Sequence, residues 1–339
     1  MSAVPEQTPS ARIIGILDGA VLAQLVQIVS ELGVADLIDD RPVPVTALAE
    51  RTSTNRDALY RALRTLAAAG VFSETEPGAF GLTPPAEALR TDSADSVRDI
   101  ARMRAGREHW RSWGELDHSV RTGESAFWHA HGTNLWRYLA ENPQVAELYD
   151  RAMGNNAQQV HEAVVAAFDF SEVRKLVDLG GGQGNLLLRL LHRHPSMYGV
   201  VLDHPHTAAA AERMFAVAGL GNRAKAIAGD FFKAVPGKAD MYVLSRILHD
   251  WDDDTARTIL SNVRDAMPTG AQLAVVDSVV PEGDASHPSK IVDIIMLALN
   301  QGRERTEAEF TTLFAATGLR HVGTWHTDAP ISVVLAEAA

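Results

Sequence analysis

Lys175-Leu-Val-Asp-Leu-Gly-Gly-Gly-Gln-Gly184 is the stretch of sequence that decides the fold of this chain. Residues 176–179 predict a short buried strand, the glycines predict a tight turn, and the leucine-rich residues 185–193 predict a buried helix. Such a unit brings backbone N–H groups close to a ligand, because no Cβ atoms stand in the way. The glycines follow a G-x-G-x-G pattern, and Asn185 stands where a dinucleotide fingerprint has its third glycine. This spacing suits a cofactor that has no pyrophosphate.

An acidic residue follows the next predicted strand. Tyr198-Gly-Val-Val-Leu-Asp203 predicts a strand that ends in a carboxylate, and such a carboxylate accepts hydrogen bonds from ribose hydroxyls in nucleotide-binding sheets. Gly180, Gly182 and Asp203 together therefore predict a nucleoside site. At this point the sequence resembles the S-adenosylmethionine-dependent methyltransferases. The resemblance implies S-adenosyl-L-methionine as the methyl donor and S-adenosyl-L-homocysteine as the product.

From residue 173 onward, predicted strands alternate with predicted helices, which indicates a mostly parallel sheet covered on both faces. The expected strands are 175–179, 198–203, 224–229, 240–245 and 271–278, and the expected helices are 184–193, 207–218, 253–266, 289–300 and 306–317. Residues 319–326 and 331–337 predict an antiparallel pair at one edge. The predicted fold class is α/β, with a Rossmann-like methyltransferase sheet.

The N-terminal residues predict a helical domain. Residues 13–32 predict a long helix that is apolar nearly all round, which favours a helical dimer interface over an intramolecular core helix. Three predicted helices within 33–69 and two short strands around a Pro-Gly turn then suggest a winged-helix shape. That shape serves either in DNA binding, through the arginines of its third helix, or in dimerisation. The net charge of -12 favours dimerisation, because phosphate binding needs a basic face.

The length of 339 residues favours more than one domain. We predict a winged-helix-like dimerisation domain at 1–95, a helical linker at 96–168 that contributes to a substrate pocket, and the cofactor-binding domain at 169–339. The linker carries the aromatic and sulfur side chains of Trp110, Trp113 and Met153, and binding sites favour such junctions. The absence of cysteine excludes disulfides and thiolate chemistry. No signal pattern is evident and no apolar run approaches the length of a membrane span, so we expect a cytoplasmic protein with no membrane partner.

Polar or aromatic residues stand at the ends of successive predicted strands, which is the edge where parallel sheets bind ligands. The third strand is followed by Asp230, expected to bind the adenine amino group, and by Phe231, expected to stack on the ring. The fourth strand ends at Ser245 and Arg246, and the fifth ends at Asp277. These residues predict one continuous binding edge.

His249 follows the buried fourth strand and lies at the same edge. One interpretation is a solvated histidine before a helix that Asp252 or Asp253 caps. A metal site is a second interpretation, but the acidic residues crowd one helix start instead of spreading over facing elements, so no metal is predicted.

Three motifs make the resemblance specific, namely Ile247-Leu-His-Asp-Trp251, Val280-Pro-Glu282 and Gly302-Arg-Glu-Arg-Thr-Glu-Ala-Glu-Phe310. They are similar to motifs of the plant caffeate-type O-methyltransferases and of bacterial enzymes that methylate aromatic polyketides and phenazines. The similarity covers nearly the whole chain. Plant members usually have glutamate where this chain has Asp277, so this carboxylate is expected to reach less far. Plant members also often have lysine where this chain has Ser245.

The resemblance implies roles for individual residues. His249 is the general base, and Asp277 and Glu304 hold and polarise it. The implied cofactor contacts are Gly180, Gly182, Asp203, Asp230, Phe231, Ser245 and Arg246, and the substrate contacts are Trp110, Trp113, Met153, Met296 and Asn300. The sequence thus predicts a homodimeric, metal-independent O-methyltransferase that acts on a phenolic hydroxyl of an aromatic natural product. Methylation of nitrogen or carbon, S-adenosylmethionine-dependent hydroxylation, and a winged-helix DNA-binding regulator are the alternatives.

Overall fold

The computed structural model describes residues 8–339, with the side chains of 155–158 left out. The chain forms two compact units. One contains residues up to Gly114 together with Trp136–Asn156, and the other contains Glu115–Leu135 together with Ala157–Ala339. The predicted linker 96–168 is therefore shared between the two units. Its functional division from its neighbours stays a prediction.

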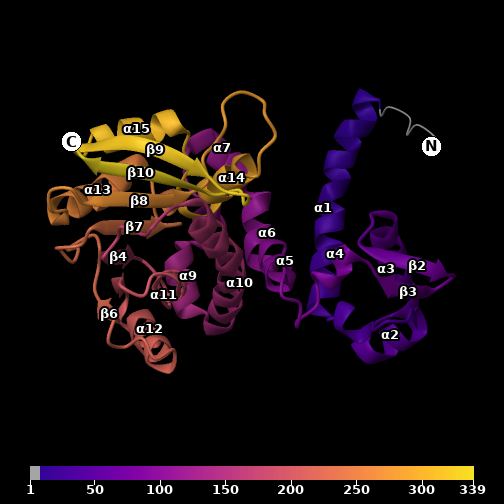
Figure 1. The fold of residues 1–339 in the computed structure, drawn as a ribbon. Helices are drawn as coiled ribbons and strands as arrows, with labels where there is room; N and C mark the ends of the chain where they lie inside the picture. The colour runs from indigo at the N-terminus through magenta and orange to yellow at the C-terminus, as the bar shows by residue number, and fades with distance from the viewer. Residues whose placement is uncertain (1–7) are drawn as a thin grey trace, which may run out of the picture. The chain divides into compact units, whose positions relative to one another are not determined.

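The second unit is built on a seven-stranded sheet in the order β6-β5-β4-β7-β8-β10-β9 (Figure 1). Five strands run parallel, and β10 is antiparallel to both of its neighbours. The strands are β4 (Lys175–Leu179), β5 (Tyr198–Asp203), β6 (Ala224–Ala228), β7 (Met241–Ser245), β8 (Gln272–Asp277), β9 (Leu319–His326) and β10 (Ser332–Ala338). The predicted α/β fold class, including the antiparallel edge pair, is confirmed.

Helices cover both faces of this sheet. On one face, the end of α10 (Pro143–Ala167), α11 (Asn185–Arg193) and α12 (Pro205–Val217) bury a core of leucine, valine and phenylalanine side chains against the strands. On the other face, α13 (Asp253–Ala266) and α15 (Glu307–Ala315) complete a second core. Because apolar residues alternate along the strands, β4, β5, β7, β8 and β10 contribute to both cores, whereas β6 contributes to the first and β9 to the second.

The strand order reverses between β4 and β7, because β5 and β6 lie on one side of β4 while β7 and β8 lie on the other. In open α/β sheets the ligand crevice lies at such a switch point, outside the carboxyl ends of the strands. The glycine turn follows β4 at this position. The fold therefore puts the turn and the end of β7 side by side.

Helix α14 (Ser289–Asn300) leads into the third motif and is anchored in the second unit by α7 (Leu116–Thr122) and α8 (Ala126–His131). The hydroxyl of Ser125 is buried at the start of α8 and donates to the carbonyls of Ala298 and Leu299, each at 2.9 Å. These carbonyls are at the C-terminus of α14, where helical acceptors lack intrahelical partners. Ser125 thus fixes the end of α14.

The first unit contains the winged-helix shape predicted for the N-terminal residues. Its elements are α1 (Pro9–Glu31), η1 (Ala35–Leu37), β1 (Val43–Pro44), α2 (Val45–Thr52), α3 (Arg56–Ala68), β2 (Phe72–Glu76), β3 (Ala79–Leu82), α4 (Pro84–Glu87), α5 (Arg98–Arg104), α6 (Arg107–Gly114) and α9 (Leu135–Glu141). A three-stranded sheet in the order β1-β3-β2 packs with α2 and α3 around Leu48, Leu63 and Phe80. The short strand β1 was not predicted.

The long N-terminal helix α1 is left largely exposed by its own chain, which agrees with the preference for a dimer interface over an intramolecular core helix. Within this chain its buried residues are Val29 and Ser30, whereas Ile16 and Leu17 are each 67% exposed. By length and composition α1 is also apolar enough to cross a membrane, so the expectation that no run approaches this length was wrong. An exposed apolar face of this size needs a cover.

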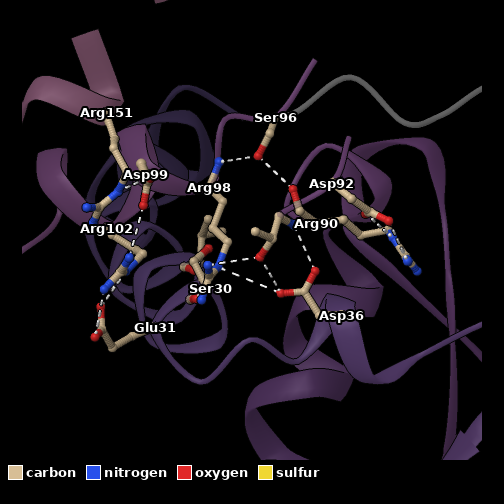
Figure 2. Close-up of polar contacts among 12 residues, drawn as sticks. Ser30, Glu31, Asp36, Arg90, Asp92, Ser96, Arg98, Asp99, Arg102 and Arg151 are labelled. Carbon is tan, nitrogen blue, oxygen red and sulfur yellow. Dashed lines mark hydrogen bonds and ion pairs between the residues drawn. The ribbon is translucent and has the colours of Figure 1, made fainter. Parts of the chain in front are cut away.

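Polar contacts hold the C-terminal end of α1 within the first unit, as Figure 2 shows. The guanidinium of Arg98 donates to the carbonyl of Ser30 at 2.9 Å, and Arg102 pairs with Glu31 at 2.7 Å. Arg102 also pairs with Asp99, which in turn contacts Arg151 of α10. The chain of charges ties α1 to α5 and α10, whereas the exposed apolar residues lie toward the other end of α1.

Candidate active site

The turn after β4 has the backbone geometry that only glycine adopts readily. Gly180, Gly182 and Gly184 have φ values of 68°, 59° and 83°, all in the left-handed region. A Cβ on Gly180 would lie 2.4 Å from the Ile247 side chain, whereas nothing in the chain lies within 4 Å of a Cβ on Gly182. Open space therefore borders the middle of the turn. This is where a ligand can approach the backbone.

The carboxylate of Asp203 connects the end of β5 to this turn. Its Oδ2 accepts a hydrogen bond from the Gly182 amide at 2.9 Å, and its Oδ1 accepts one from the His204 amide at 2.7 Å. Each carboxylate oxygen keeps further acceptor capacity for ligand hydroxyls. Gly182 and Asp203, predicted from separate strands, thus form one cradle that fits the ribose of an adenosyl cofactor.

Asp230 and Phe231 follow β6, at the same edge of the sheet. The ring of Phe231 lies beside the glycine turn, because a Cβ on Gly180 would be 3.5 Å from it. Asp230 accepts from the Phe232 amide at 3.0 Å and pairs with Lys233, and these two contacts hold the pKa of Asp230 below its usual range. The ring of Phe231 therefore borders the glycine turn, while Asp230 is bonded to its own loop, and cofactor contacts by both residues stay predictions.

The end of β7 lies next to β4, with Leu244 paired to Leu179. Ser245 is half-buried there, and the following Arg246 has a left-handed φ of 57°, which is uncommon for a residue with a Cβ. The amide of Arg246 donates to the Val276 carbonyl of β8 at 2.9 Å. This kink turns the chain away from the sheet and leads into the segment that carries His249.

Asp178 lies beneath the glycine turn. Its carboxyl group is packed against Gly181, where a Cβ would come within 2.5 Å of it. Burial, with the nearby charge of Asp203, raises the pKa of Asp178 to about 7. Neither carboxyl oxygen has a hydrogen-bond partner among the residues that the structure describes. The floor of the turn therefore holds a buried carboxyl group whose oxygens have no partner in the described part of the chain.

His249 lies in a 3₁₀ turn, η2 (Leu248–Asp250), and is buried. Its Nδ1 lies 2.7 Å from Oε1 of the equally buried Glu304. Asp277 Oδ1 is 4.0 Å from the same nitrogen, and Asp250 Oδ1 is 3.9 Å from Nε2. Gly302 is required beside this turn, because a Cβ there would lie 2.1 Å from the His249 carbonyl oxygen.

The three predicted catalytic side chains are thus close together, but the two acids are not equivalent. Asp277 reaches less far than a glutamate would, as expected, because its side chain is one methylene shorter, and its Oδ1 stops 4.0 Å from Nδ1, beyond hydrogen-bond distance. Both of its oxygens are without a hydrogen-bond partner in the described part of the chain. Asp277 therefore acts on His249 through its charge.

Burial and charge act in opposite directions on this cluster. Burial alone would lower the pKa of His249, but Asp277, the hydrogen bond to Glu304 and the charge of Asp250 together raise it to about 9. Burial raises the pKa of Asp277 to about 7, against the attraction of His249. The imidazole is therefore a stronger base than free histidine.

Of the substrate contacts implied by the resemblance, Met296 and Asn300 are in the second unit. Asn300 donates to Asp250 Oδ1 at 3.0 Å, next to His249, and Met296 accepts the Gly302 amide at 3.2 Å through its carbonyl. Trp110, Trp113 and Met153 belong to the first unit, where the indole N–H of Trp113 donates to the Arg104 carbonyl at 2.9 Å. Substrate binding by all five stays a prediction.

Two residues of the cluster were missed by sequence reasoning. Asp250 neighbours His249 and is bonded by Asn300, and Arg305 is buried behind the turn. Both are part of the quoted motifs, so their positions in the sequence were the available signal. Among the described residues, no group of three or more histidine, aspartate or glutamate side chains has the arrangement of a metal site. The N-cap of α13 is Asp252, one of the two residues expected there.

Comparisons with known proteins agree on a family. The O-methyltransferase domain matches residues 113–320, and the O-methyltransferase dimerisation domain matches residues 14–92. Phenazine O-methyltransferase PhzM of Lysobacter antibioticus is 42% identical over 96% of this chain and 95% of its own length. The crystal structure of LaPhzM aligns with a TM-score of 0.91, at 40% identity, over 98% of this chain and all of that one.

Other relatives bear on the cofactor and on the reaction. CalO1, a methyltransferase in calicheamicin biosynthesis solved with S-adenosylhomocysteine bound, aligns with a TM-score of 0.87 at 35% identity, over 98% of this chain and all of that one. An 8-amino-8-demethylriboflavin N,N-dimethyltransferase of Streptomyces davaonensis is 33% identical over 94% of this chain and 92% of its own length. The aclacinomycin 10-hydroxylase RdmB of Streptomyces purpurascens is 34% identical over 81% of this chain and 75% of its own. Taken with the cradle at Gly182 and Asp203, these matches establish that the chain belongs to the O-methyltransferase family and is an S-adenosylmethionine-dependent O-methyltransferase.

Proposed function

We propose that this enzyme methylates a phenolic hydroxyl of an aromatic small molecule in natural-product biosynthesis, with His249 as the general base. The observation that carries the proposal is the 2.7 Å contact between His249 Nδ1 and Glu304 Oε1 in a buried position. In the neutral imidazole, Nδ1–H donates to this carboxylate, which leaves the lone pair on Nε2. The base is therefore Nε2.

S-adenosylmethionine, when bound, supplies a methyl group already activated by its sulfonium sulfur. His249 Nε2 accepts the proton of the acceptor hydroxyl as the oxygen takes the methyl group. A phenol has a pKa of about 10, and the pKa of His249 is raised to about 9. The proton transfer is therefore nearly balanced, at a cost of about 1.4 kcal/mol per unit of difference. Glu304 and Asp277 stabilise the imidazolium that results.

The aromatic character of the acceptor is proposed from the family and from side chains. The relatives include the phenazine O-methyltransferase, and the enzyme NcsB1 was solved with 2-hydroxy-5-methyl naphthoic acid. In this chain, Trp110, Trp113, Met153, Met296 and Asn300 are the proposed acceptor contacts. Apolar and aromatic linings with a few polar groups are usual for such sites. Gly180, Gly182, Asp203, Asp230, Phe231, Ser245 and Arg246 are the proposed cofactor contacts.

A pair of variants tests the two halves of the proposal. Asp203→Ala is expected to abolish binding of S-adenosylhomocysteine in calorimetry, because it removes the cradle at Gly182. His249→Ala is expected to keep that binding and to lose roughly 10²–10⁴-fold in methylation rate, which is what a general base contributes. Full activity of His249→Ala on the true acceptor would overturn the base assignment. Mass spectrometry of the product distinguishes O-methylation from methylation of nitrogen or carbon and from hydroxylation.

We further propose that the enzyme is a cytoplasmic homodimer in which a second copy covers the exposed apolar face of α1. The match of the family's dimerisation domain to residues 14–92 supports this proposal, since it includes most of α1. The net charge of -12 argues against nucleic acid as a partner. Covering by a second copy also accounts for the hydropathy of α1 without a membrane.

A further inference from the structure

Arg305 is the largest fully buried side chain of the described chain, with 1% exposure. A buried guanidinium is rare unless it is paired, and here each of its five N–H groups has an acceptor. Nε and Nη2 donate to Asp253 Oδ1 at 3.1 and 2.9 Å. Nη1 donates to the carbonyls of Leu248 and Arg303 at 3.0 and 3.5 Å, and Nη2 donates to the carbonyl of Trp251 at 3.0 Å.

Two of these acceptors flank His249. The Leu248 carbonyl precedes it directly, and the Trp251 carbonyl follows two residues later, at the end of the 3₁₀ turn. The turn itself has two long internal bonds, from the Asp250 amide to the Ile247 carbonyl and from the Trp251 amide to the Leu248 carbonyl, each at 3.2 Å. Such a short element has little stability of its own. Arg305 therefore braces both ends of the turn that carries the imidazole.

The backbone of Arg305 contacts the remaining members of the cluster. Glu304 directly precedes Arg305 in the chain. The Arg305 carbonyl accepts a hydrogen bond from the Val280 amide at 2.9 Å, in the segment that follows Asp277. Val279 and Arg305 also form a parallel bridge. One residue thus joins the segments that supply His249, Glu304 and Asp277.

We infer that Arg305 is a positioning residue for the reaction, because its buried guanidinium fixes the turn of His249 against Glu304. The inference rests on the proposed role of His249 as the base. It assigns Arg305 no contact with the acceptor or the cofactor. Its charge also opposes the effect of burial on the pKa of Asp277, although burial is the larger influence.

Arg303 provides a matched control. It lies two residues away in the same motif and pairs with the same Asp253, at 3.4 Å, and with Glu309 at 2.6 Å. Its side chain is 43% exposed, and no contact of its side chain with the turn carbonyls is recorded in the described chain. Replacing Arg303 removes one of the two arginines paired with Asp253 but leaves the hydrogen bonds from Arg305 to the Leu248 and Trp251 carbonyls in place.

The test is a double-mutant cycle. Arg305→Lys keeps the charge but has three donors in place of a fixed five-donor fork. A displacement of about 1 Å at a catalytic group lowers the reaction rate roughly 10²-fold. In Arg305→Lys, kcat is therefore expected to fall about 10- to 100-fold, while the KM for S-adenosylmethionine stays within about twofold. In a His249→Gln background the same substitution is expected to have no further effect on kcat, because its target is gone. Arg303→Lys is expected to leave kcat within about twofold.

The outcomes separate the inference from the proposed function. Full activity of His249→Gln alone overturns the base assignment. If His249→Gln lowers kcat while folded Arg305→Lys does not, the positioning role is overturned. It is also overturned if Arg305→Lys lowers kcat by the same factor in the wild-type and His249→Gln backgrounds. If Arg305→Lys does not fold, Asp253→Asn loosens the guanidinium from an accessible position. Asp253→Asn is expected to lower kcat by a smaller factor than Arg305→Lys, and to have no further effect on kcat in the His249→Gln background. A further loss of kcat in that background refutes the inference.

Discussion

Replacing Glu304 with glutamine removes one negative charge beside His249 and retains an oxygen that can accept from Nδ1–H. In the wild type, Nδ1 and Oε1 are 2.7 Å apart in a buried site, and the carboxylates raise the pKa of His249 to about 9. An opposite charge at this range shifts a pKa by about 1–3 units. In Glu304→Gln the pKa of His249 is therefore expected to fall to between about 6 and about 8.

The sign of the pH dependence follows from the protonation state that the base needs. With a pKa of about 9, about 1% of His249 is neutral at pH 7, so kcat/KM for the acceptor rises with pH through about 9. Ionisation of a phenol near pH 10 limits the upper side. In the variant the rising limb moves to lower pH, and the plateau falls roughly 10-fold because the imidazolium loses a stabilising charge.

The assay is the initial rate of methyl transfer at saturating S-adenosylmethionine, measured from about pH 6 to about pH 10 in overlapping buffers. Glu307→Gln is the control, because it makes the same chemical change three residues away on an exposed position of α15. It is expected to leave the midpoint near 9. A midpoint that also stays near 9 in Glu304→Gln would show that the carboxylate does not set the basicity of His249.

Three further substitutions test the packing, the electrostatics and the assembly. Gly302→Ala places a Cβ within 2.1 Å of the His249 carbonyl oxygen, so kcat should fall at least about 10-fold. The affinity for S-adenosylhomocysteine, measured by calorimetry, should stay unchanged, and an unchanged kcat would refute the close approach. Burial lowers the pKa of His161 from 6.5 to about 4, so this histidine binds its proton more readily in the unfolded chain. The free energy of unfolding is therefore expected to fall by about 3 kcal/mol between pH 6.5 and pH 4. His161→Leu should remove that part of the dependence in urea titrations, and an unaltered acid limb would contradict it. Ile16→Glu on the exposed face of α1 should give monomers in light scattering. Val217→Glu on α12, where the valine is 91% exposed, is the control and should leave the dimer intact. A dimer that persists in Ile16→Glu would exclude this interface.

Much of the fold could be predicted because its signals are local. Alternating runs and glycine positions gave strands and helices close to those observed, from β4 through β10. The strand β1 was missed because it has two residues, of which one is proline. The exposure of α1 within its own chain was expected, because one small domain cannot cover a helix that is apolar nearly all round, and what covers the helix stays a prediction.

The site was predictable only in part. The resemblance named His249, Asp277 and Glu304, and the aspartate in place of the usual glutamate predicted a shorter reach, but the 4.0 Å separation from His249 Nδ1 came only from the structure. The bond from Asn300 to Asp250 was not predicted, and the acceptor contact of Asn300 stays a prediction. Arg305 was given no role, because charged residues are rarely buried completely and its partners are mostly backbone carbonyls that no sequence pattern identifies.

The reversal of strand order between β4 and β7 has an evolutionary consequence. The glycine turn, Asp203 and Phe231 lie at or after the ends of β4, β5 and β6 on one side of that boundary. On the other side, His249, Asp277 and Glu304 lie at or after the ends of β7, β8 and α14. Substitutions after about residue 245 can therefore change the reaction while the cradle is inherited intact. Relatives named as an N,N-dimethyltransferase and as a hydroxylase, at 33% and 34% identity, are the kind of divergence that such a modular sheet permits.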